Sequence, residues 1–318
     1  MINFRFHLIS LIAVFLALAV GVVMGYGVLG QPTVDTLQNR IDTVEGRANK
    51  IKSENKELKT ENNRLSTAME ALSNFAVESR LQGITAVPIA VRGVNEDKVT
   101  DTVRLARGAG ASVPGVIWLE DKWNLDNADD TAQLATIVKT QSTSRAAVRD
   151  AAAKALANRL SSGPATGART DLLDELANAK FLSLQSIDDL HFDAANLDGR
   201  AATGSSRLEH LLIGGTNAAV PAARGTVPLA RALVADSASV VAVDDWQKTD
   251  GGPGRGDGLA EILGDEQLQA VVATFDSLDT PDGPLTAVLV LGDRGQGVIG
   301  HYGSGAGADL QVPKWWPV

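Results

Sequence analysis

The fold is decided first by residues 34–76, which read VDTLQNRIDTVEGRANKIKSENKELKTENNRLSTAMEALSNFA. Within this stretch, side chains spaced alternately three and four residues apart form a seven-residue repeat. Position a of the repeat is filled by Val34, Ile41, Ala48, Asn55, Asn62, Met69 and Ala76. Position d is filled by Leu37, Val44, Ile51, Leu58, Leu65 and Leu72. A repeat of this kind and length predicts helices that supercoil around one another, so we expect residues 31–80 to form a coiled coil.

Polar residues in and beside this seam favour a parallel homodimer. Asn55 and Asn62 occupy core a positions, where an asparagine can bond to its counterpart in a parallel partner and fix the register. The flanking e and g positions give two attractive pairs and one repulsive pair between chains, namely Arg40 with Glu45, Glu54 with Lys59, and Arg47 with Lys52. A trimer is the alternative assembly. The alternative without self-association is an amphipathic helix lying on the chain's own globular domain.

An uncharged and almost wholly apolar segment precedes the repeat. Its residues, 8–29, number about 22 and reach about 33 Å as a helix, enough to cross the hydrocarbon core of a membrane. Arg5 lies before the segment, and Asp35 is the first charged residue after it. The positive-inside rule then predicts that residues 1–7 are a cytoplasmic tail, that residues 8–30 are a membrane anchor and that the rest is extracytoplasmic.

A cleaved signal peptide is the alternative for this segment, because residues 17–19 (ALA) resemble a cleavage site. The apolar run continues to Leu29, well past that site, which favours an uncleaved anchor. Gly21 and Gly25 form a GxxxG pair, through which two membrane helices can pack closely. The anchor is therefore predicted to support the same association as the coiled coil.

Charge and cysteine content restrict the function of the remainder. The formal net charge is −9, and the eight basic and eight acidic residues between positions 35 and 80 cancel. With Arg5 set aside, the chain beyond position 80 carries a net charge of −10. Such an acidic domain is not drawn by its charge to nucleic acid or to an anionic membrane surface. The chain has no cysteine and therefore uses no disulfide.

Residues 81–318 are long enough for one substantial hydrophobic core. We predict a strand over Ile84–Val91, a helix over 95–107 and a strand over Val116–Leu119, which together form a βαβ unit with parallel strands. Pro88 has no amide hydrogen, so it predicts an edge position or a bulge for the first strand.

The rest of the domain continues the alternation of helices and strands. Helices are predicted over residues 144–160, 170–179, 258–275 and near 208–212. Strands are predicted over residues 239–243 and 285–291. This alternation predicts a three-layer α/β domain around a mainly parallel sheet.

Acidic residues follow three of the predicted strands. They are Glu120 and Asp121, Asp244 and Asp245, and Asp293. Ligands bind beyond the carboxyl ends of strands in open α/β sheets, where converging carboxylates can hold a divalent metal for hydrolysis. The simpler interpretation is that these acids start turns and cap helices. It is preferred because no nucleophile or phosphate-binding motif accompanies them, so we predict that the chain is not an enzyme and uses no cofactor.

Three segments carry a resemblance to a known family. They are NFRFHLISLIAVFLALAVGVVMG from residue 3, DTPDGPLTAVLVL from residue 279 and GDRGQGVIGHYGSGAGA from residue 292. Together they resemble the actinobacterial envelope family of the copper transport protein MctB, also called SteB, over the whole chain. Within the third segment, Gly300, His301, Tyr302 and Gly303 are candidate site residues. Closure of the last strand–loop unit is preferred for them over contact with a ligand or partner.

The resemblance implies two roles. One is copper transport across the envelope and copper homeostasis, with an outer-membrane location. The other is a part in cell division beside a cytoplasmic SteA-like protein, in which the coiled coil supports an extracytoplasmic peptidoglycan hydrolase.

The residues favour the second role. Copper(I) prefers thiolate and thioether ligands, and imidazole suits copper(II). The side chains that could supply such ligands are Met1, Met24, Met69, His7, His191, His210 and His301, and no two histidines have the spacing of a metal site. One apolar helix without ionisable residues cannot line a channel by itself. The leading hypothesis is therefore a scaffold or regulator of envelope growth and division, and copper transport is the alternative.

Overall fold

The computed structural model describes residues 4–28, 30–164, 170–187, 207–245, 247–249, 252–254, 256–305 and 307–314. The chain divides into two compact units, Met1–Arg64 and Leu65–Val318.

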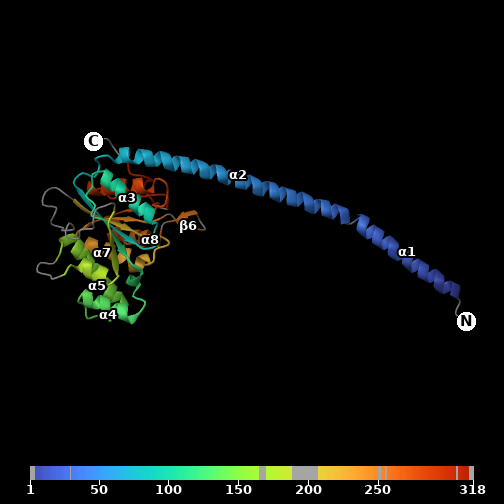
Figure 1. Ribbon diagram of the computed structural model, residues 1–318, viewed down its shortest axis with the longest axis horizontal. Coiled ribbons are helices and arrows are strands. Elements are labelled where there is room, and N and C mark those ends of the chain that lie inside the picture. Colours follow the sequence, from blue (N-terminus) through green and yellow to red (C-terminus); the bar gives the residue numbers. More distant parts are fainter. Residues whose placement is uncertain are drawn as a thin grey trace. The chain divides into compact units, whose positions relative to one another are not determined.

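Two long helices begin the chain (Figure 1): α1 covers Phe4–Val28 and α2 covers Gly30–Val77. Within α1, the 22 residues Phe4–Gly25 are long and apolar enough to cross a membrane. The 48 residues of α2 form a helix about 72 Å long. The predicted anchor and the predicted heptad segment are thus both helical, and α2 ends three residues before the expected boundary at position 80.

The last turn of α2 enters the core of the second unit on a face that differs from the heptad seam. Ser73 and Val77 are buried, as is Leu81 beyond the helix, whereas Leu72 at a d position is 60% exposed. The amide of Leu81 donates a 2.8 Å hydrogen bond to the carbonyl of Ala109. The heptad repeat therefore does not describe how the end of α2 packs.

A seven-stranded sheet forms the centre of the second unit, in the order β3-β2-β1-β4-β5-β8-β9. Its strands are β1 (Ile84–Val91), β2 (Val116–Leu119), β3 (Leu182–Gln185), β4 (Arg207–Ile213), β5 (Ser239–Val243), β8 (Val272–Phe275) and β9 (His301–Tyr302). Only the pairing of β2 with β3 is antiparallel among these strands. The predicted mainly parallel α/β sheet is confirmed. A separate two-stranded ribbon joins β6 (Gln247–Thr249) to β7 (Gly252–Gly254).

Helices cover both faces of the sheet, which gives three layers (Figure 1). The helices α3 and α10 pack together on one face, and α5 and α7 pack together on the other. The helices of the second unit beyond α2 are α3 (Glu96–Gly108), α4 (Ala128–Ile137), α5 (Arg145–Ser162), α6 (Leu172–Asn178), α7 (Thr226–Ala235), α8 (Asp257–Gly264), α9 (Glu266–Gln269) and α10 (Gly283–Gly295). Two short 3-10 helices cover Asp121–Asn124 and Ala222–Arg224.

The βαβ unit β1–α3–β2 is confirmed, but the edge position expected from Pro88 is wrong. Strand β1 lies inside the sheet between β2 and β4. The amide of Ala86 bonds toward the β2 side, to the carbonyl of Ser112, and Pro88 faces the same side because strand residues alternate. Regular pairing with β2 starts only at Ile89. Pro88 thus faces a gap in the ladder, where no amide donor is needed.

Three sequence predictions are wrong in element type. Residues 208–212 belong to the buried strand β4, and residues 285–291 belong to the helix α10, which has a proline in its first turn. The almost wholly apolar run 285–291 fits a buried strand or a buried helix equally well. In 208–212 the leucines are interrupted by Glu209 and His210, and the sequence does not show that these polar residues are buried in a strand. The helix predicted over 258–275 is interrupted at Asp265, which caps α9, and its last four residues form β8.

Candidate functional site

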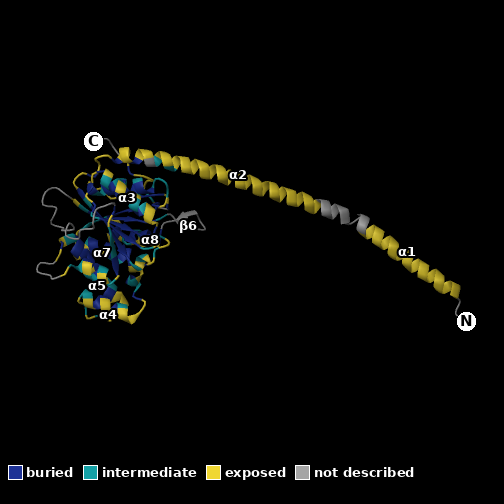
Figure 2. Cartoon of the chain, in the orientation of Figure 1, coloured by how far each residue is buried: buried dark blue, intermediate teal, exposed yellow. Residues whose placement is uncertain are grey.

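Almost all of α2 is exposed (Figure 2), and its heptad positions form an apolar stripe within that exposed surface. Leu37, Ile41, Val44, Ile51, Leu58, Leu65 and Leu72 are between 49% and 67% exposed. Asn55 and Asn62 continue the stripe and are exposed as well. The helical backbone of Val34 is described, but its side chain lies outside the described part. Because a fully buried Leu, Ile or Val side chain contributes about 1.5–3 kcal/mol, covering this stripe would release substantial free energy.

Charged pairs flank the stripe within the same helix. Lys50 lies 3.7 Å from Glu54, and Arg64 lies 2.6 Å from Glu61. Exposed pairs of this spacing contribute little to stability. They keep the outer faces of α2 soluble and leave the apolar stripe as its distinctive surface.

Gly21 and Gly25 of the anchor have no other part of the described chain against them. A Cβ atom placed on Gly21 or Gly25 would meet nothing within 4 Å. These positions have the small surface that allows a second helix to approach closely.

The glycine-rich segment closes the far edge of the sheet. Its residues His301 and Tyr302 form β9, which pairs in parallel with β8. The Nδ1 atom of His301 lies 3.0 Å from Oγ1 of Thr274. A side chain at Gly300 would overlap the ring of Tyr302, and Gly303 has a φ of +124°. The contacts of these residues with their own domain support the structural interpretation of the segment.

The acids predicted at strand ends do not converge as one set. Glu120 accepts a 3.0 Å bond from Nε of Arg92, and Asp245 accepts bonds from both the amide and the hydroxyl of Thr216. Asp293 lies on α10 and is therefore not at a strand end. Glu120 and Asp245 therefore bond to groups of their own domain and do not form a shared site.

Asp244 differs from the other acids because it is buried, with 4% exposure, at the carboxyl end of β5. It accepts a 3.4 Å bond from the amide of Leu259 in α8. Burial raises the pKa of Asp244 to about 7, and the neighbouring Asp245 adds to the rise. Asp244 also borders a cavity of about 380 Å³ that Asp257 and Glu261 help to line.

Asp276 follows β8 and was missed because that strand was predicted to be helical. It is fully buried and accepts bonds of 2.8 and 2.9 Å from the amides of Ser304 and Gly305. The signal in the sequence was a strand-like run, Val272–Phe275, that ends directly in an acid. Its role in holding the glycine-rich segment is structural.

A metal-dependent hydrolase gains no support from this geometry. In the part of the chain that the structure describes, no three His, Cys, Asp or Glu side chains are grouped to hold a metal ion. The acids beside Asp244 come without a positioned histidine in that same part.

The candidate copper ligands are dispersed. His7 and Met24 lie on α1, Met69 lies on α2, and His301 lies on β9, while His191 and Met1 fall outside the described residues. His210 is fully buried on β4, and its Nδ1 atom lies 3.1 Å from the carbonyl oxygen of Ser239. Burial lowers the pKa of His210 to about 4, so its ring is neutral at physiological pH. Isolated imidazoles of this kind do not form a transition-metal site.

These features define a class of protein with an apolar N-terminal helix, a long heptad-bearing helix and a mainly parallel α/β domain. The family described as "Copper transport outer membrane protein, MctB" matches residues 1–313, and the chain belongs to this family. A relative from Mycobacterium leprae (strain TN), named "Copper transporter MctB", is 30% identical and covers 99% of this chain and 100% of its own length.

Proteins of the same name from Mycobacterium bovis (strain ATCC BAA-935 / AF2122/97) and Mycobacterium tuberculosis (strain ATCC 25618 / H37Rv) are each 26% identical to this chain. Both cover 97% of this chain and 98% of their own length. The resemblance identified from the sequence is confirmed. These relatives are named as transporters and not as enzymes.

Proposed function

We propose that this chain is a non-enzymatic, membrane-anchored envelope protein that self-associates through α2 and acts as a scaffold in envelope growth and division. The observation that carries the proposal is the apolar stripe of α2. Such a stripe is not maintained on a helix that stays alone in water, and its seven-residue spacing suits a second copy of the same helix. In this proposal the self-associated α2 helices form a rod, and the acidic α/β domain is attached to its C-terminal end.

The anchor sets the direction of the chain across the membrane. Arg5 precedes the uncharged segment 8–29, and the residues directly beyond that segment carry no basic excess. By the positive-inside rule, the N-terminus is cytoplasmic and the α/β domain is extracytoplasmic. Gly21 and Gly25 allow two anchors to pack side by side, in agreement with a parallel rod.

The partners follow from the family resemblance. A short cytoplasmic tail and an anchor can meet a SteA-like protein at the inner face of the membrane. The outer faces of a two-stranded rod offer an extracytoplasmic peptidoglycan hydrolase a helical docking surface. The net charge of −10 beyond position 80 does not favour nucleic acid among these partners.

Substitutions in the seam test the self-association. In the full chain in detergent, Leu58→Ser combined with Leu65→Ser should convert a dimer into a monomer in analytical ultracentrifugation. The matched control, Lys56→Ser combined with Thr60→Ser, changes outer positions of the same helix and should remain dimeric. Circular dichroism and tryptophan fluorescence should show an intact α/β domain in both variants. A seam variant that stays dimeric even when Gly21 and Gly25 are replaced by leucine contradicts the proposal.

Copper transport is the second candidate, favoured by the names of the family and of its relatives. One membrane span cannot form a channel alone, so copper would have to pass through an assembly or be handled indirectly. Cell-associated copper in a deletion strain, compared with the complemented strain at equal external copper, decides this point. A rise on deletion that the gene reverses supports copper transport, and failure of the seam variant to reverse it shows that the assembly is required. Unchanged cell-associated copper would contradict copper transport and leave the scaffold role as the remaining candidate.

A further inference from the structure

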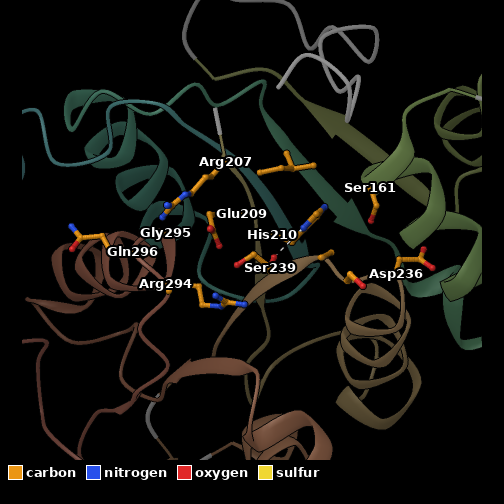
Figure 3. Close-up of a pocket in the computed structure, with 13 residues that line it drawn as sticks. Ser161, Arg207, Glu209, His210, Asp236, Ser239, Arg294, Gly295 and Gln296 are labelled. Atoms are coloured by element: carbon orange, nitrogen blue, oxygen red, sulfur yellow. Dashed lines mark hydrogen bonds between the residues drawn. The ribbon is translucent and has the colours of Figure 1, made fainter. Parts of the chain in front are cut away.

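A cavity of about 490 Å³ opens at the amino-terminal edge of the sheet, where β4 and β5 begin (Figure 3). Its walls also include the C-terminal ends of α5 and α10. It lies wholly in the α/β domain and is separate from the carboxyl-edge cavity beside Asp244. Its volume falls in the range of sites for small molecules.

Buried polar atoms without partners are concentrated around this cavity. Among the described residues, five buried side-chain polar atoms have no hydrogen-bond partner, and four of them belong to residues that line it. These four are Oε2 of Glu209, Nε2 of His210, Oγ of Ser239 and Nε of Arg294. Because buried polar groups are almost always paired with protein, water or ligand, this concentration makes the cavity a candidate site for a polar ligand.

Three of the four atoms lie on one side of the sheet. Glu209 and Ser239 are register partners in the parallel pair β4–β5, so their side chains point to the same face. Figure 3 shows Arg294 of α10 on that side, below Glu209 and Ser239. His210 follows Glu209 in the strand and faces the opposite side. Glu209, Ser239 and Arg294 are therefore the core of the site, which we call the Glu–Ser–Arg cluster.

The charges around the cluster favour an anion. Burial raises the pKa of Glu209, while the hydroxyl of Ser239 and the guanidinium groups of Arg294 and Arg207 oppose that rise. Glu209 is 2% exposed, so its neutral form is favoured whenever a negative charge binds beside it. With Glu209 neutral, two guanidinium groups face the cavity, and the carboxylate of Asp236 lies exposed at its rim.

We propose that this cavity binds a small organic carboxylate, held by the guanidinium of Arg294 and the hydroxyl of Ser239, with Glu209 as a neutral hydrogen-bond donor. A guanidinium and a carboxylate match in geometry and charge. A metal cation is disfavoured by the two guanidinium groups. A monoanionic carboxylate is preferred over a dianionic phosphate because the guanidinium of Arg294 is partly buried at the cluster, whereas Arg207 is exposed. This inference is independent of the scaffold role.

Binding of acetate and glycolate to the full chain in deuterated detergent micelles tests the proposal. Saturation-transfer NMR should show both anions bound at pH 6, with inorganic phosphate as the comparison. Arg294→Gln should weaken binding about tenfold or more, because a charge-assisted pair is lost. Arg294→Lys, which keeps the charge, separates this loss from misfolding. The control Asp236→Asn changes only a rim charge and should preserve binding.

The pH dependence gives the sharpest readout. Affinity should fall as pH rises and Glu209 ionises. In Glu209→Gln, where an uncharged amide replaces the acid, affinity should be retained and should no longer depend on pH in this way. Equal binding by the wild type and Arg294→Gln would overturn the proposal, as would phosphate binding more tightly than the carboxylates. Absence of binding by either carboxylate at millimolar concentration would show that water alone fills the cavity.

Discussion

The phenol hydroxyl of Tyr302 donates a 2.6 Å hydrogen bond to Oδ2 of Asp293, and this bond joins the edge strand β9 to the last turns of α10. Tyr302 is 4% exposed, so the bond is shielded from water. Burial and the adjacent carboxylate raise the pKa of Tyr302, which keeps the phenol protonated as a donor. The glycine-rich segment is therefore fixed to the domain by its own aromatic residue.

Removal of this hydroxyl should destabilise the domain. We expect Tyr302→Phe to lower the free energy of unfolding by about 2 kcal/mol, because a carboxylate loses a charge-assisted bond in a buried place. Urea unfolding followed by tryptophan fluorescence measures the change. Ser304→Ala is the control, since the side chain of Ser304 is exposed and only its amide is used. Equal unfolding midpoints for Tyr302→Phe and the wild type would contradict this assignment.

Gly303→Ala should be more damaging than the same change at Gly297. A Cβ on Gly303 would overlap the buried carboxylate of Asp276, and the φ of +124° disfavours any side chain. A Cβ on Gly297 meets nothing within 4 Å, although its φ is +86°. We expect a loss of about 1 kcal/mol for Gly297→Ala and roughly 3 kcal/mol or more for Gly303→Ala. Comparable losses for the two variants would show that the Asp276 contact is unimportant.

Asp244 should make the domain less stable as pH rises. Its pKa is about 7 in the folded chain against an ordinary 3.8, so its contribution is fully present below pH 3.8 and is lost as pH rises through 7. The linked loss is about 4 kcal/mol at most. Asp244→Asn, which keeps an acceptor for the Leu259 amide, should unfold at higher urea than the wild type at pH 8 and should differ less at pH 4. A wild-type advantage at pH 8 would show that the charged form is stabilised.

His210 should have the opposite dependence. Its pKa is about 4 in the folded chain against an ordinary 6.5, so its contribution is fully present above pH 6.5 and is lost as pH falls through 4. His210→Asn keeps a donor near the Ser239 carbonyl and removes the titration. The unfolding free energy of this variant should fall less steeply than that of the wild type between pH 6.5 and 4. Parallel pH profiles would indicate that the imidazole is not protected by burial.

The sequence predicts an element well when the element has a regular hydrophobic repeat or a capping residue that marks where it begins. The heptad repeat gives the helical extent of α2, and Asn95 marks the start of α3, where its side chain accepts from the amides of Asp97 and Lys98. The types of α10 and β4 could not be predicted, because α10 is apolar over most of its length and β4 buries the polar residues Glu209 and His210 among its leucines. Tertiary burial, and not local preference, decides such segments.

Asp276 and the Glu–Ser–Arg cluster differ in how far the sequence predicts them. Asp276 is predictable once β8 is recognised as a strand. The Glu–Ser–Arg cluster is not predictable, because Glu209 and Arg294 belong to different elements and neither lies in a spacing that signals binding. Only the packing of α10 against β4 and β5 brings them to one cavity.

Disulfide cross-linking tests the proposed parallel dimer most directly, because the natural chain has no cysteine. In the full chain in membranes, Asn55→Cys places a thiol at a core a position, where two parallel helices in register bring equivalent residues together. Thr60→Cys places a thiol on the outer face of the same helix as the control. We predict rapid oxidation of Asn55→Cys to a covalent dimer and little cross-linking of Thr60→Cys. No dimer at Asn55→Cys, or equal cross-linking at both positions, would contradict the parallel coiled coil.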